Sequence, residues 1–453
     1  MKLLKYSLLI LSLLASSVVA VAQQNPTAEA DAAFKNFAYF NAIDLYKKAY
    51  SKEKKVAEKK RILYNIGRCY YELQDNENAE SWLKKAVLAG HPDPDAQYYY
   101  ADAIRKQGRY DEAITEFQKF KDENQGDPRG PKGIEQCQLA QEWTDNPTRY
   151  VVEVEPLLNS KQYDFSPAFA AKRYDELILT STREGAFGNE VDLNTGQSFS
   201  ALWHTERDKK GKWSVPEPLN ETVNMPEANV GASSMDKRFK ELYFTKCVSA
   251  KNKVLGCDIY KARKQGREWA EAELVPIKKP DTNKVGHPSV GLNDEYLFFA
   301  SDMPGGKGGR DIWFIKYDKK EKAWGAPVNV AGVNTKGDEM FPYIHNDGRL
   351  FFASNGHPGM GGLDIFVAQR NGESDSWGEP ENMKAPINSS ANDFGIIFEG
   401  DKDRGFLTSD REGGRGSDDI WSFRTPPLKF IIDGVVTDVE TGDPIPGAKI
   451  LLA

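Results

Sequence analysis

The chain has 453 residues, a formal net charge of −7 and 40% hydrophobic residues, a length that predicts about two to four domains rather than one. Its 23 Phe, 19 Tyr and 9 Trp exclude a wholly disordered chain, because disordered chains are poor in aromatic residues. The acidic balance argues against a nucleic-acid partner, which would require a basic face.

The first 22 residues show the three parts of a secretory signal. A start that contains two lysines is followed by an apolar run over 8–14 and by the small residues Ala20-Val21-Ala22. We therefore predict a cleaved signal over 1–22, with a buried helix or an anchor as the alternative. The first cysteine is Cys69, which disfavours a lipoprotein. No later run approaches the ~18–20 apolar residues of a membrane-spanning helix, so none is expected after cleavage.

Residues 26–146 have helical periodicity, with small residues at repeated offsets. Three sets of packing residues recur, led by Ala42, Ala79 and Ala113. Turn signals such as Gln74-Asp75-Asn76-Glu77 separate the helices. The pattern predicts an all-α array of helical hairpins in which small side chains allow close packing, with a closing helix over 132–143.

This stretch resembles the tetratricopeptide repeat family. The resemblance rests on these residues of the second and third repeats: Gly67, Tyr70, Ala79, Leu83, Ala86, Pro92, Ala101, Gly108, Tyr110, Ala113 and Phe117. Such arrays bind peptides on the inner face of the first helix of each hairpin. On this resemblance, the groove would be lined by Arg61, Tyr64, Asn65, Arg68, Tyr98, Asp102 and Arg105. The alternative is that these side chains are ordinary packing or solvated residues.

A second repeat, of about 53 residues, occupies 149–424. Its most regular feature is an Asp-Ile-aromatic tripeptide that begins, at spacings of 53, 53 and 55 residues, with Asp258, Asp311, Asp364 and Asp419. An aromatic strand and a loop precede each tripeptide, and no helical pattern lies between them. Four short antiparallel strands per repeat predict an all-β propeller.

The ends of this region indicate how many blades the propeller has. The segment 150–157 reads as a strand without a blade, whereas the last repeat meets Pro426-Pro427 before any fourth strand. If the N-terminal strand completes the last blade, the ring closes without a free edge and has five blades. The alternative of six blades would require a further repeat that we do not find.

The tripeptides resemble the WD40-like (PD40) propeller repeats of periplasmic proteins such as the TolB group. The loops before them are rich in glycine, but no Lys-Ser/Thr pair or helix follows, so we reject phosphate binding. Calcium bound by the repeated aspartates is a second alternative. We favour a structural role, in which each carboxylate accepts hydrogen bonds from loop N–H groups at the start of a strand.

The cysteines and histidines give little indication of a metal site or of catalysis. Cys247 and Cys257 lie ten residues apart around a loop, which predicts a disulfide across a hairpin, with two buried thiols as the alternative. The five histidines form no zinc signature, and no nucleophile turn occurs. His287 and His345 have related places in two blades and would form a channel-lining pair, although local packing is the favoured interpretation. We expect no catalytic residue, metal or cofactor, and no enzymatic activity.

After Pro426-Pro427 the pattern changes again. Residues 428–453 contain Gly-x-Val-x-Asp at 434–438 and Thr-Gly-x-Pro-Ile-Pro-Gly-Ala at 441–448. These motifs resemble the start of the carboxypeptidase regulatory-like β-sandwich. Two strands cannot bury a sandwich core, so we expect a domain that is cut off at Ala453.

The order of signal, helical repeats, propeller and sandwich is similar to that of the multi-domain OmpA-family envelope proteins of the Bacteroidetes, a group that includes the PorE component of the type IX secretion system. The resemblance implies a non-enzymatic periplasmic scaffold, associated with the outer membrane, that supports protein secretion or gliding. Its partners would be envelope proteins, in particular outer-membrane secretion components. Peptidoglycan binding is implied only through a domain beyond Ala453. A glycan- or peptide-binding propeller, hydrolytic or not, and a general envelope maintenance protein are the alternatives.

Overall fold

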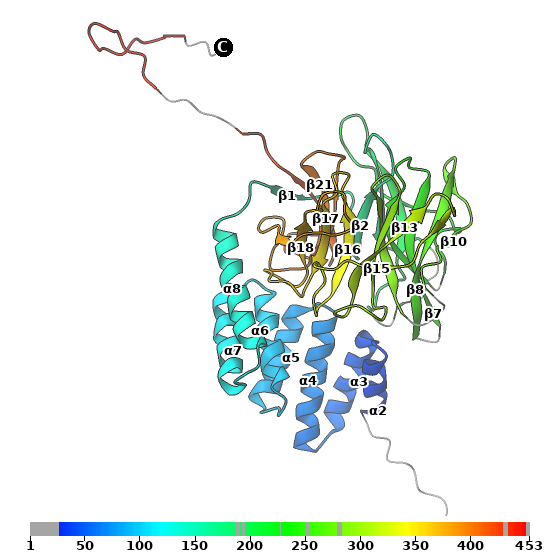
Figure 1. The fold of residues 1–453 in the computed structure, drawn as a ribbon. Helices are drawn as coiled ribbons and strands as arrows, with labels where there is room; N and C mark the ends of the chain where they lie inside the picture. The colour runs from blue at the N-terminus through cyan, green and yellow to red at the C-terminus, as the bar shows by residue number, and fades with distance from the viewer. Residues whose placement is uncertain are drawn as a thin grey trace, which may run out of the picture.

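The computed structural model describes residues 27–186, 191–192, 195–226, 228–250, 253–278, 283–428 and 434–449. A helical array comes first in the chain and is followed by five small antiparallel sheets. In Figure 1 the helices lie against one face of the sheets, and the C-terminal residues run away from both. The signal predicted for 1–22 lies outside the described residues.

The helical array is all-α, as predicted. The described part of the chain forms seven helices: α2 (Ala28–Lys35), α3 (Tyr39–Lys52), α4 (Val56–Glu72), α5 (Asn76–Leu88), α6 (Asp95–Arg105), α7 (Tyr110–Glu123) and α8 (Arg129–Asp145). Consecutive helices pack as hairpins, and α8 covers α7 where the closing helix is expected. None of the helices in the described ranges is both long and apolar enough to cross a membrane.

Small residues set the distance between the helices of a hairpin. A methyl group on Gly67 of α4 would lie 2.7 Å from Cγ of Leu83 on α5, closer than side chains pack. Gly133 of α8 is in the same position with respect to Phe117 of α7, whose ring would lie 2.6 Å away. The small residues of the repeat therefore act as expected, since they let the bulky partner approach the backbone.

The sheets are the blades of a propeller, each with its strands in antiparallel order. Blade 1 contains β2 (Asp164–Phe169), β3 (Glu176–Ser181), β4 (Ala201–Glu206) and β5 (Glu217–Pro218). Blade 2 contains β6 (Ala228–Met235), β7 (Glu241–Ala250), β8 (Lys253–Gln265), β9 (Glu268–Trp269) and β10 (Glu273–Leu274). Blade 3 contains β11 (Val285–Gly291), β12 (Tyr296–Ser301), β13 (Asp311–Asp318), β14 (Ala323–Trp324) and β15 (Val328–Asn329). Blade 4 contains β16 (Glu339–Ile344), β17 (Leu350–Ser354), β18 (Asp364–Ala368) and β19 (Glu381–Asn382).

Blade 5 shows how the ring closes. It contains β20 (Asp393–Phe398), β21 (Arg404–Ser409), β22 (Asp419–Arg424) and, from the start of the propeller, β1 (Val151–Val154). Strand β1 pairs antiparallel with β22, in a register that places Val154 opposite Trp421. The prediction of five blades closed by the N-terminal strand is confirmed, and the six-blade alternative does not occur.

The aromatic strands form the cores between blades. Phe298 and Phe299 follow each other on β12 and point to opposite faces of the sheet. Phe298 packs in one buried cluster with Phe352 of blade 4, whereas Phe299 packs in another with Tyr243 of blade 2. One strand therefore contributes to the cores on both of its sides, which explains why consecutive residues such as Leu297, Phe298 and Phe299 are all apolar.

The innermost strands share a bulge that faces the channel of the propeller. At the bulge a residue with positive φ occurs in each blade, namely Ser166, Ala232, His287, Phe341 and Gly395. In the first three of these blades the N–H of this residue donates to a threonine of the preceding blade, at 2.8–2.9 Å. These hydrogen bonds join adjacent blades at the edge of the channel.

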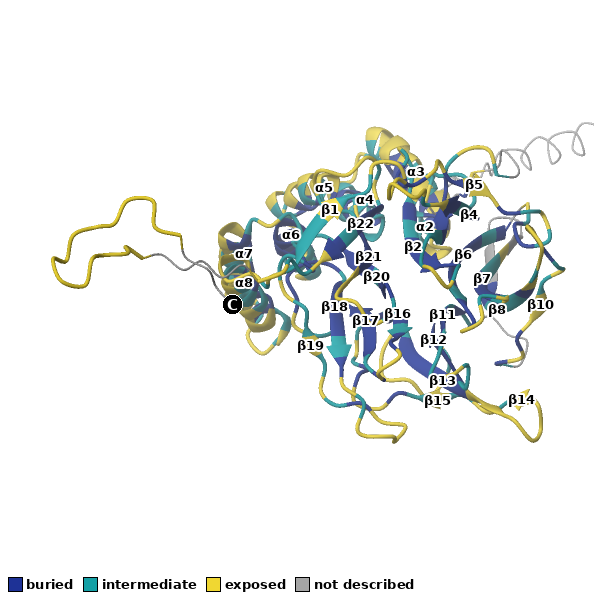
Figure 2. Cartoon of the chain, turned by 90° about the horizontal axis from the view of Figure 1, so that it is seen from above, coloured by how far each residue is buried: buried dark blue, intermediate teal, exposed yellow. Residues whose placement is uncertain are grey.

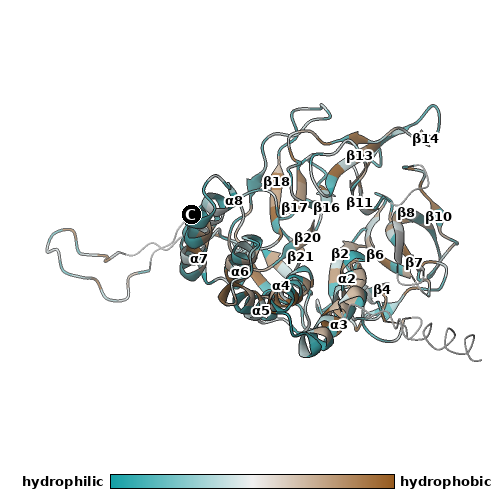
Figure 3. Ribbon diagram, turned by 90° about the horizontal axis from the view of Figure 1, so that it is seen from below, coloured by the Kyte–Doolittle hydropathy of each residue, from teal (hydrophilic) through white to brown (hydrophobic). Residues whose placement is uncertain are grey.

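The helices cover one side of the ring. In Figure 2 the five blades surround a common centre, and the helices overlap the part that contains β1, β20–β22 and β2. Figure 3, from the opposite side, shows α2–α8 as an arc in front of these strands, with β7, β8, β10 and β14 beyond it. In 434–449 an antiparallel bridge joins Thr437 and Pro444, and the residues are exposed. The predicted sandwich stays a prediction.

Candidate protein-binding site

The helical array docks onto the propeller through a loop of blade 4. This loop, 355–363, connects β17 to β18. Arg105 at the end of α6 donates from Nη1 to the carbonyl oxygen of Gly361 at 2.6 Å, and the Tyr110 hydroxyl donates to that of Met360 at 3.3 Å. The Met360 side chain is 2% exposed and belongs to the buried cluster of the helices. The loop is therefore part of the helical core.

A buried ion pair supports this contact from the helical side. Nη2 of Arg105 lies 2.7 Å from Oδ1 of Asp102, and the two residues are only 6% and 3% exposed. The Tyr71 hydroxyl donates to the other carboxylate oxygen of Asp102 at 2.5 Å, and Nζ of Lys106 lies 3.7 Å from it. Burial alone would raise the pKa of Asp102, but Arg105 and Lys106 outweigh burial and keep this pKa below its ordinary value.

The predicted groove residues of the second repeat are partly exposed and contact one another or their neighbours. Arg61 pairs with Asp31 on α2 at 2.8 Å, and Asn65 donates to the Tyr46 hydroxyl at 3.0 Å. These contacts tie α4 to the first repeat. Both side chains therefore have a packing role, and part of each stays accessible to solvent.

Tyr64, Arg68 and Tyr98 form the rest of this partly exposed surface. The Tyr64 ring stacks on His91 at 4.6 Å, and the Arg68 guanidinium lies 3.7 Å from the centre of the Tyr99 ring on α6. The Tyr98 ring has the Arg129 guanidinium of α8 at 4.7 Å. Aromatic rings and arginines thus alternate from α4 to α8.

The seven predicted groove residues do not form one open surface. Five remain on the partly exposed side of the array: Arg61, Tyr64, Asn65, Arg68 and Tyr98. Asp102 and Arg105 are instead covered by the blade 4 loop. The sequence showed the charges and their helix, but no signal in it indicated that the loop around Met360 would cover them.

Three of the four repeated aspartates have the geometry of a structural role. Asp364 accepts hydrogen bonds from the N–H groups of Met360 and Gly361 at 2.9 and 3.0 Å. Asp311 and Asp419 accept pairs of N–H groups from the corresponding loops. Asp258 differs, since it lies 3.2 Å from Nζ of Lys278. Within the described ranges no group of three or more His, Cys, Asp or Glu is arranged to hold a metal ion.

A repeated asparagine was missed by the sequence reasoning. In four blades its side-chain amide binds both the N–H and the carbonyl of one residue in the third strand, as a peptide group would; these residues are Asn159, Asn224, Asn334 and Asn388. Three of the four precede an acidic residue at the start of an inner strand by five positions, for example Asn334 before Glu339. This spacing was visible in the sequence and identifies a structural element, not a ligand site.

The cysteines and histidines are placed as follows. Cys247 and Cys257 face each other on β7 and β8 and are joined by a disulfide. His287 lies at the channel, stacked on Phe341 at 3.8 Å, and its Nδ1 accepts the Phe341 N–H. Burial lowers the pKa of His287 to about 3, so the ring is neutral at neutral pH. His345 is buried in its blade, with Nε2 at 3.0 Å from the Gly400 carbonyl oxygen.

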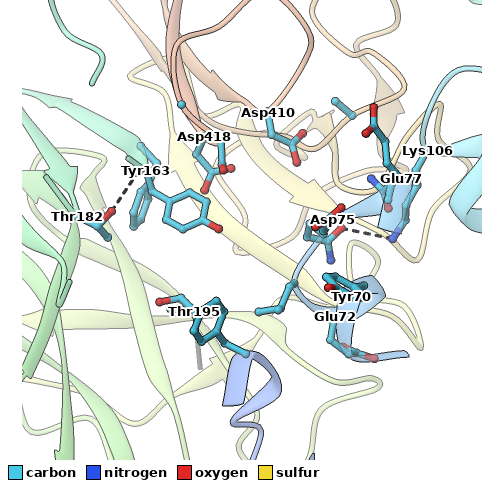
Figure 4. A pocket seen from close by; sticks show the side chains of 18 of the residues that line it. Tyr70, Glu72, Asp75, Glu77, Lys106, Tyr163, Thr182, Thr195, Asp410 and Asp418 are labelled. Atoms are coloured by element: carbon cyan, nitrogen blue, oxygen red, sulfur yellow. Dashed lines mark hydrogen bonds between the residues drawn. The ribbon is translucent and has the colours of Figure 1, made fainter. Parts of the chain in front are cut away.

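Two cavities lie at opposite ends of the propeller channel. The outer cavity, of about 820 Å³, is lined by the bulges of the inner strands, including His287 and Phe341. The repeat-side cavity, of about 1150 Å³, lies between the propeller and the ends of α3, α4 and α6. Figure 4 shows its two walls, with Asp410 and Asp418 on the propeller and Asp75, Glu77 and Lys106 on the helices.

Comparison with known proteins supports the helical part. The tetratricopeptide repeat family model matches residues 27–93 and 85–128, so the predicted repeats are confirmed over this range. A comparison with curated protein sequences finds no match. The combination of these repeats with a propeller is that of a protein whose surfaces serve protein–protein interaction.

Solved structures resemble the two parts separately. The second tetratricopeptide domain of human RPAP3, in complex with an HSP70 peptide, is 19% identical with a TM-score of 0.23, and the match covers 25% of this chain and 92% of that one. The mannose phosphorylase MPT-4 from Leishmania mexicana is 12% identical with a TM-score of 0.41, over 64% of this chain and 92% of that one. An α-L-arabinofuranosidase from Lactobacillus brevis is 11% identical with a TM-score of 0.39, over 66% of this chain and 97% of that one. At such values the enzymes give no argument for catalysis by this chain.

Proposed function

We propose that the protein is a non-enzymatic scaffold of the bacterial periplasm that is associated with the outer membrane and supports type IX protein secretion or gliding. Two contacts support a scaffold best: Arg105 donates to the Gly361 carbonyl, and Met360 packs in the core of the helices. Together they join two interaction folds into one body with an extended surface. The envelope location rests on the sequence resemblance to OmpA-family proteins, PorE among them. Attachment to peptidoglycan would need a domain beyond Ala453.

The proposal that the chain is not an enzyme has support from the histidines. His287 and His345 do not converge, because His287 stacks on Phe341 at the channel, whereas His345 of blade 4 contacts the Gly400 carbonyl oxygen of blade 5. General acid–base chemistry requires a proton-transfer group that is free to reach a substrate. Both rings are instead engaged with the protein itself.

The test is affinity purification of the tagged full chain from envelope extracts of the source bacterium after mild cross-linking. We expect outer-membrane secretion components to co-purify. Tyr64→Ala should reduce their recovery, because Tyr64 belongs to the partly exposed surface of the second repeat. Lys84→Ala, which changes an exposed side chain of α5, is the matched control. Recovery of the free monomer alone would contradict the scaffold role. Recovery of the same partners in equal yield from Tyr64→Ala and Lys84→Ala would contradict the role of the surface that contains Tyr64.

A further inference from the structure

The repeat-side cavity is acidic. Its lining includes eight carboxylates, namely Asp44, Glu72, Asp75, Glu77, Asp192, Asp410, Glu412 and Asp418. It also includes four bases, namely Lys47, Lys106, Arg109 and Arg411. On both walls the carboxylates outnumber the bases. The acidic character is therefore a property of the whole cavity and not of one loop.

Three of the four bases are neutralised by carboxylates from outside the lining. Lys106 lies beside Asp102, Arg109 pairs with Glu80 and Glu112, and Arg411 pairs with Asp393. Lys47 donates to the Tyr70 hydroxyl at 2.7 Å. The positive charges at the cavity are therefore largely used. Lys106 also lowers the pKa of Asp410 against the larger effect of burial. Glu72 pairs with Arg68, so the remaining carboxylates of the lining account for the acidic excess.

Asp418 and Asp410 are two acidic residues of the cavity whose charged forms are disfavoured by their surroundings. They lie close together on the propeller wall in Figure 4, with Tyr163 beside Asp418. Burial raises the pKa of Asp418 well above its ordinary value, and the negative charges of Asp410, Asp419 and Asp164 raise it further. Burial also raises the pKa of Asp410. A cation placed between these carboxylates would stabilise their charged forms.

The size and remaining lining of the cavity favour a peptide over a small cation. About 1150 Å³ exceeds the roughly 300–1,000 Å³ of pockets for small ligands. Thr182, Ser200 and Asn229 bring hydroxyl and amide groups to the lining, which suit a peptide backbone. The rings of Tyr70 and Tyr163 are also at the wall, where they would pack on the stems and charges of lysine or arginine.

We propose that the repeat-side cavity binds a basic peptide segment of a partner protein, with Asp418 and Asp410 as the acceptors of its lysine or arginine side chains. The site is distinct from the partly exposed surface of the second repeat and does not depend on the envelope role proposed above. Because it lies between the helices and the propeller, both parts of the chain contribute to recognition.

The experiment measures binding of a short fluorescein-labelled peptide of alternating lysine and serine to the full chain by fluorescence anisotropy, at low and at physiological ionic strength. We expect this peptide to bind more tightly than its glutamate–serine counterpart. Asp418→Asn should weaken binding about tenfold, because a hydrogen bond to a charged group is lost. Asp401→Asn removes an equal charge at the outer cavity and should leave the Kd within about twofold.

A second variant keeps the test valid if Asp418→Asn perturbs folding. Ser417→Arg changes an exposed neighbour of Asp418 and places a guanidinium of the chain itself at the cavity, so it should abolish binding. Three outcomes would overturn the proposal: no preference for the lysine peptide, equal weakening by Asp418→Asn and Asp401→Asn, or displacement of the peptide by spermidine at an equal concentration. The last of these would show that the site recognises charge alone.

Discussion

The second and third repeats use corresponding positions of their first helices in opposite ways. Arg68 follows Gly67 in α4, and Asp102 follows Ala101 in α6, so the two residues occupy the same place in the repeat. The Arg68 side chain is 18% exposed and lies on the Tyr99 ring at the surface. Asp102 is buried and holds Arg105 against the blade 4 loop. The same repeat position thus serves as surface in one hairpin and as a docking anchor in the next.

The difference has an energetic consequence. An ion pair that remains in contact with water contributes little to stability, because solvent screens the charges. Removing one partner of a buried pair is costly, because the remaining charge has neither water nor a counter-charge. The third repeat should therefore be much more sensitive to charge removal than the second.

The largest effect is expected from Arg105→Met. The substitution leaves the Asp102 carboxylate buried without its main partner and removes the hydrogen bond to Gly361. We expect a loss of about 3–5 kcal/mol in the free energy of unfolding, measured by urea denaturation. Arg68→Met is the comparison variant and should cost less, because the ion pair of Arg68 with Glu72 stays partly exposed to water. Equal losses in the two variants would contradict the distinction between the repeats.

Met360→Ala tests the apolar side of the same anchor. Met360 belongs to the propeller chain segment but is buried among α6, α7 and α8. Its truncation should cost about 2–3 kcal/mol through lost burial and the cavity left behind. Amide hydrogen exchange should accelerate in α6 and α7. Met303→Ala, in a core between blades 2 and 3, should leave exchange in these helices unchanged.

The sequence predicts the elements well, because each depends on local pattern. The spacing of Gly67, Ala79 and Leu83 indicates hairpins, and the recurrence of Asp311 and Asp364 indicates blades. The pairing of β1 with β22 was also predictable, since an incomplete last blade and an extra strand match each other. These features belong to repeats, so one copy of a repeat can be compared with the next within the same sequence.

The contact between the two domains was not predictable in this way. Arg105 and Gly361 are far apart in the sequence, and their hydrogen bond is a single contact that does not belong to a repeated pattern. The glycines that permit the loop were visible, but the carbonyl that Arg105 would meet was not. The repeat-side cavity has the same origin, because neither domain contains it alone. The parts of the candidate site that form only when the helical array docks onto the propeller are therefore the least predictable from the sequence.

Asp364→Asn tests whether the docking loop is sensitive to pH. Asp364 is 1% exposed, and burial raises its pKa to about 6, whereas an unfolded chain has a value of about 4. The native state then binds the proton more tightly, so the free energy of unfolding falls as pH rises from about 4 to about 6 and is level above that. This group should account for about 3 kcal/mol of the fall.

Urea denaturation between pH 4 and pH 7 measures the effect. The stability of Asp364→Asn relative to the unmodified chain should rise across this window, because the variant lacks the group that becomes charged. Asp401→Asn, exposed at the outer cavity, controls for the loss of a carboxylate elsewhere. Parallel pH profiles of Asp364→Asn and the unmodified chain would show that Asp364 titrates alike in both states.

The smallest effect is expected from Lys132→Met, which isolates burial as the cause of the difference between anchors. Lys132 on α8 and Arg105 on α6 both donate to carbonyls of the blade 4 loop, at Gly356 and Gly361, with distances of 2.8 and 2.6 Å. Lys132 is exposed and Arg105 is buried. Because water replaces the lost lysine contact, the free energy of unfolding should fall by less than about 1 kcal/mol in urea denaturation. A loss as large as that of Arg105→Met would mean that contact with the loop, and not desolvation of the charge, decides which anchor holds the two domains together.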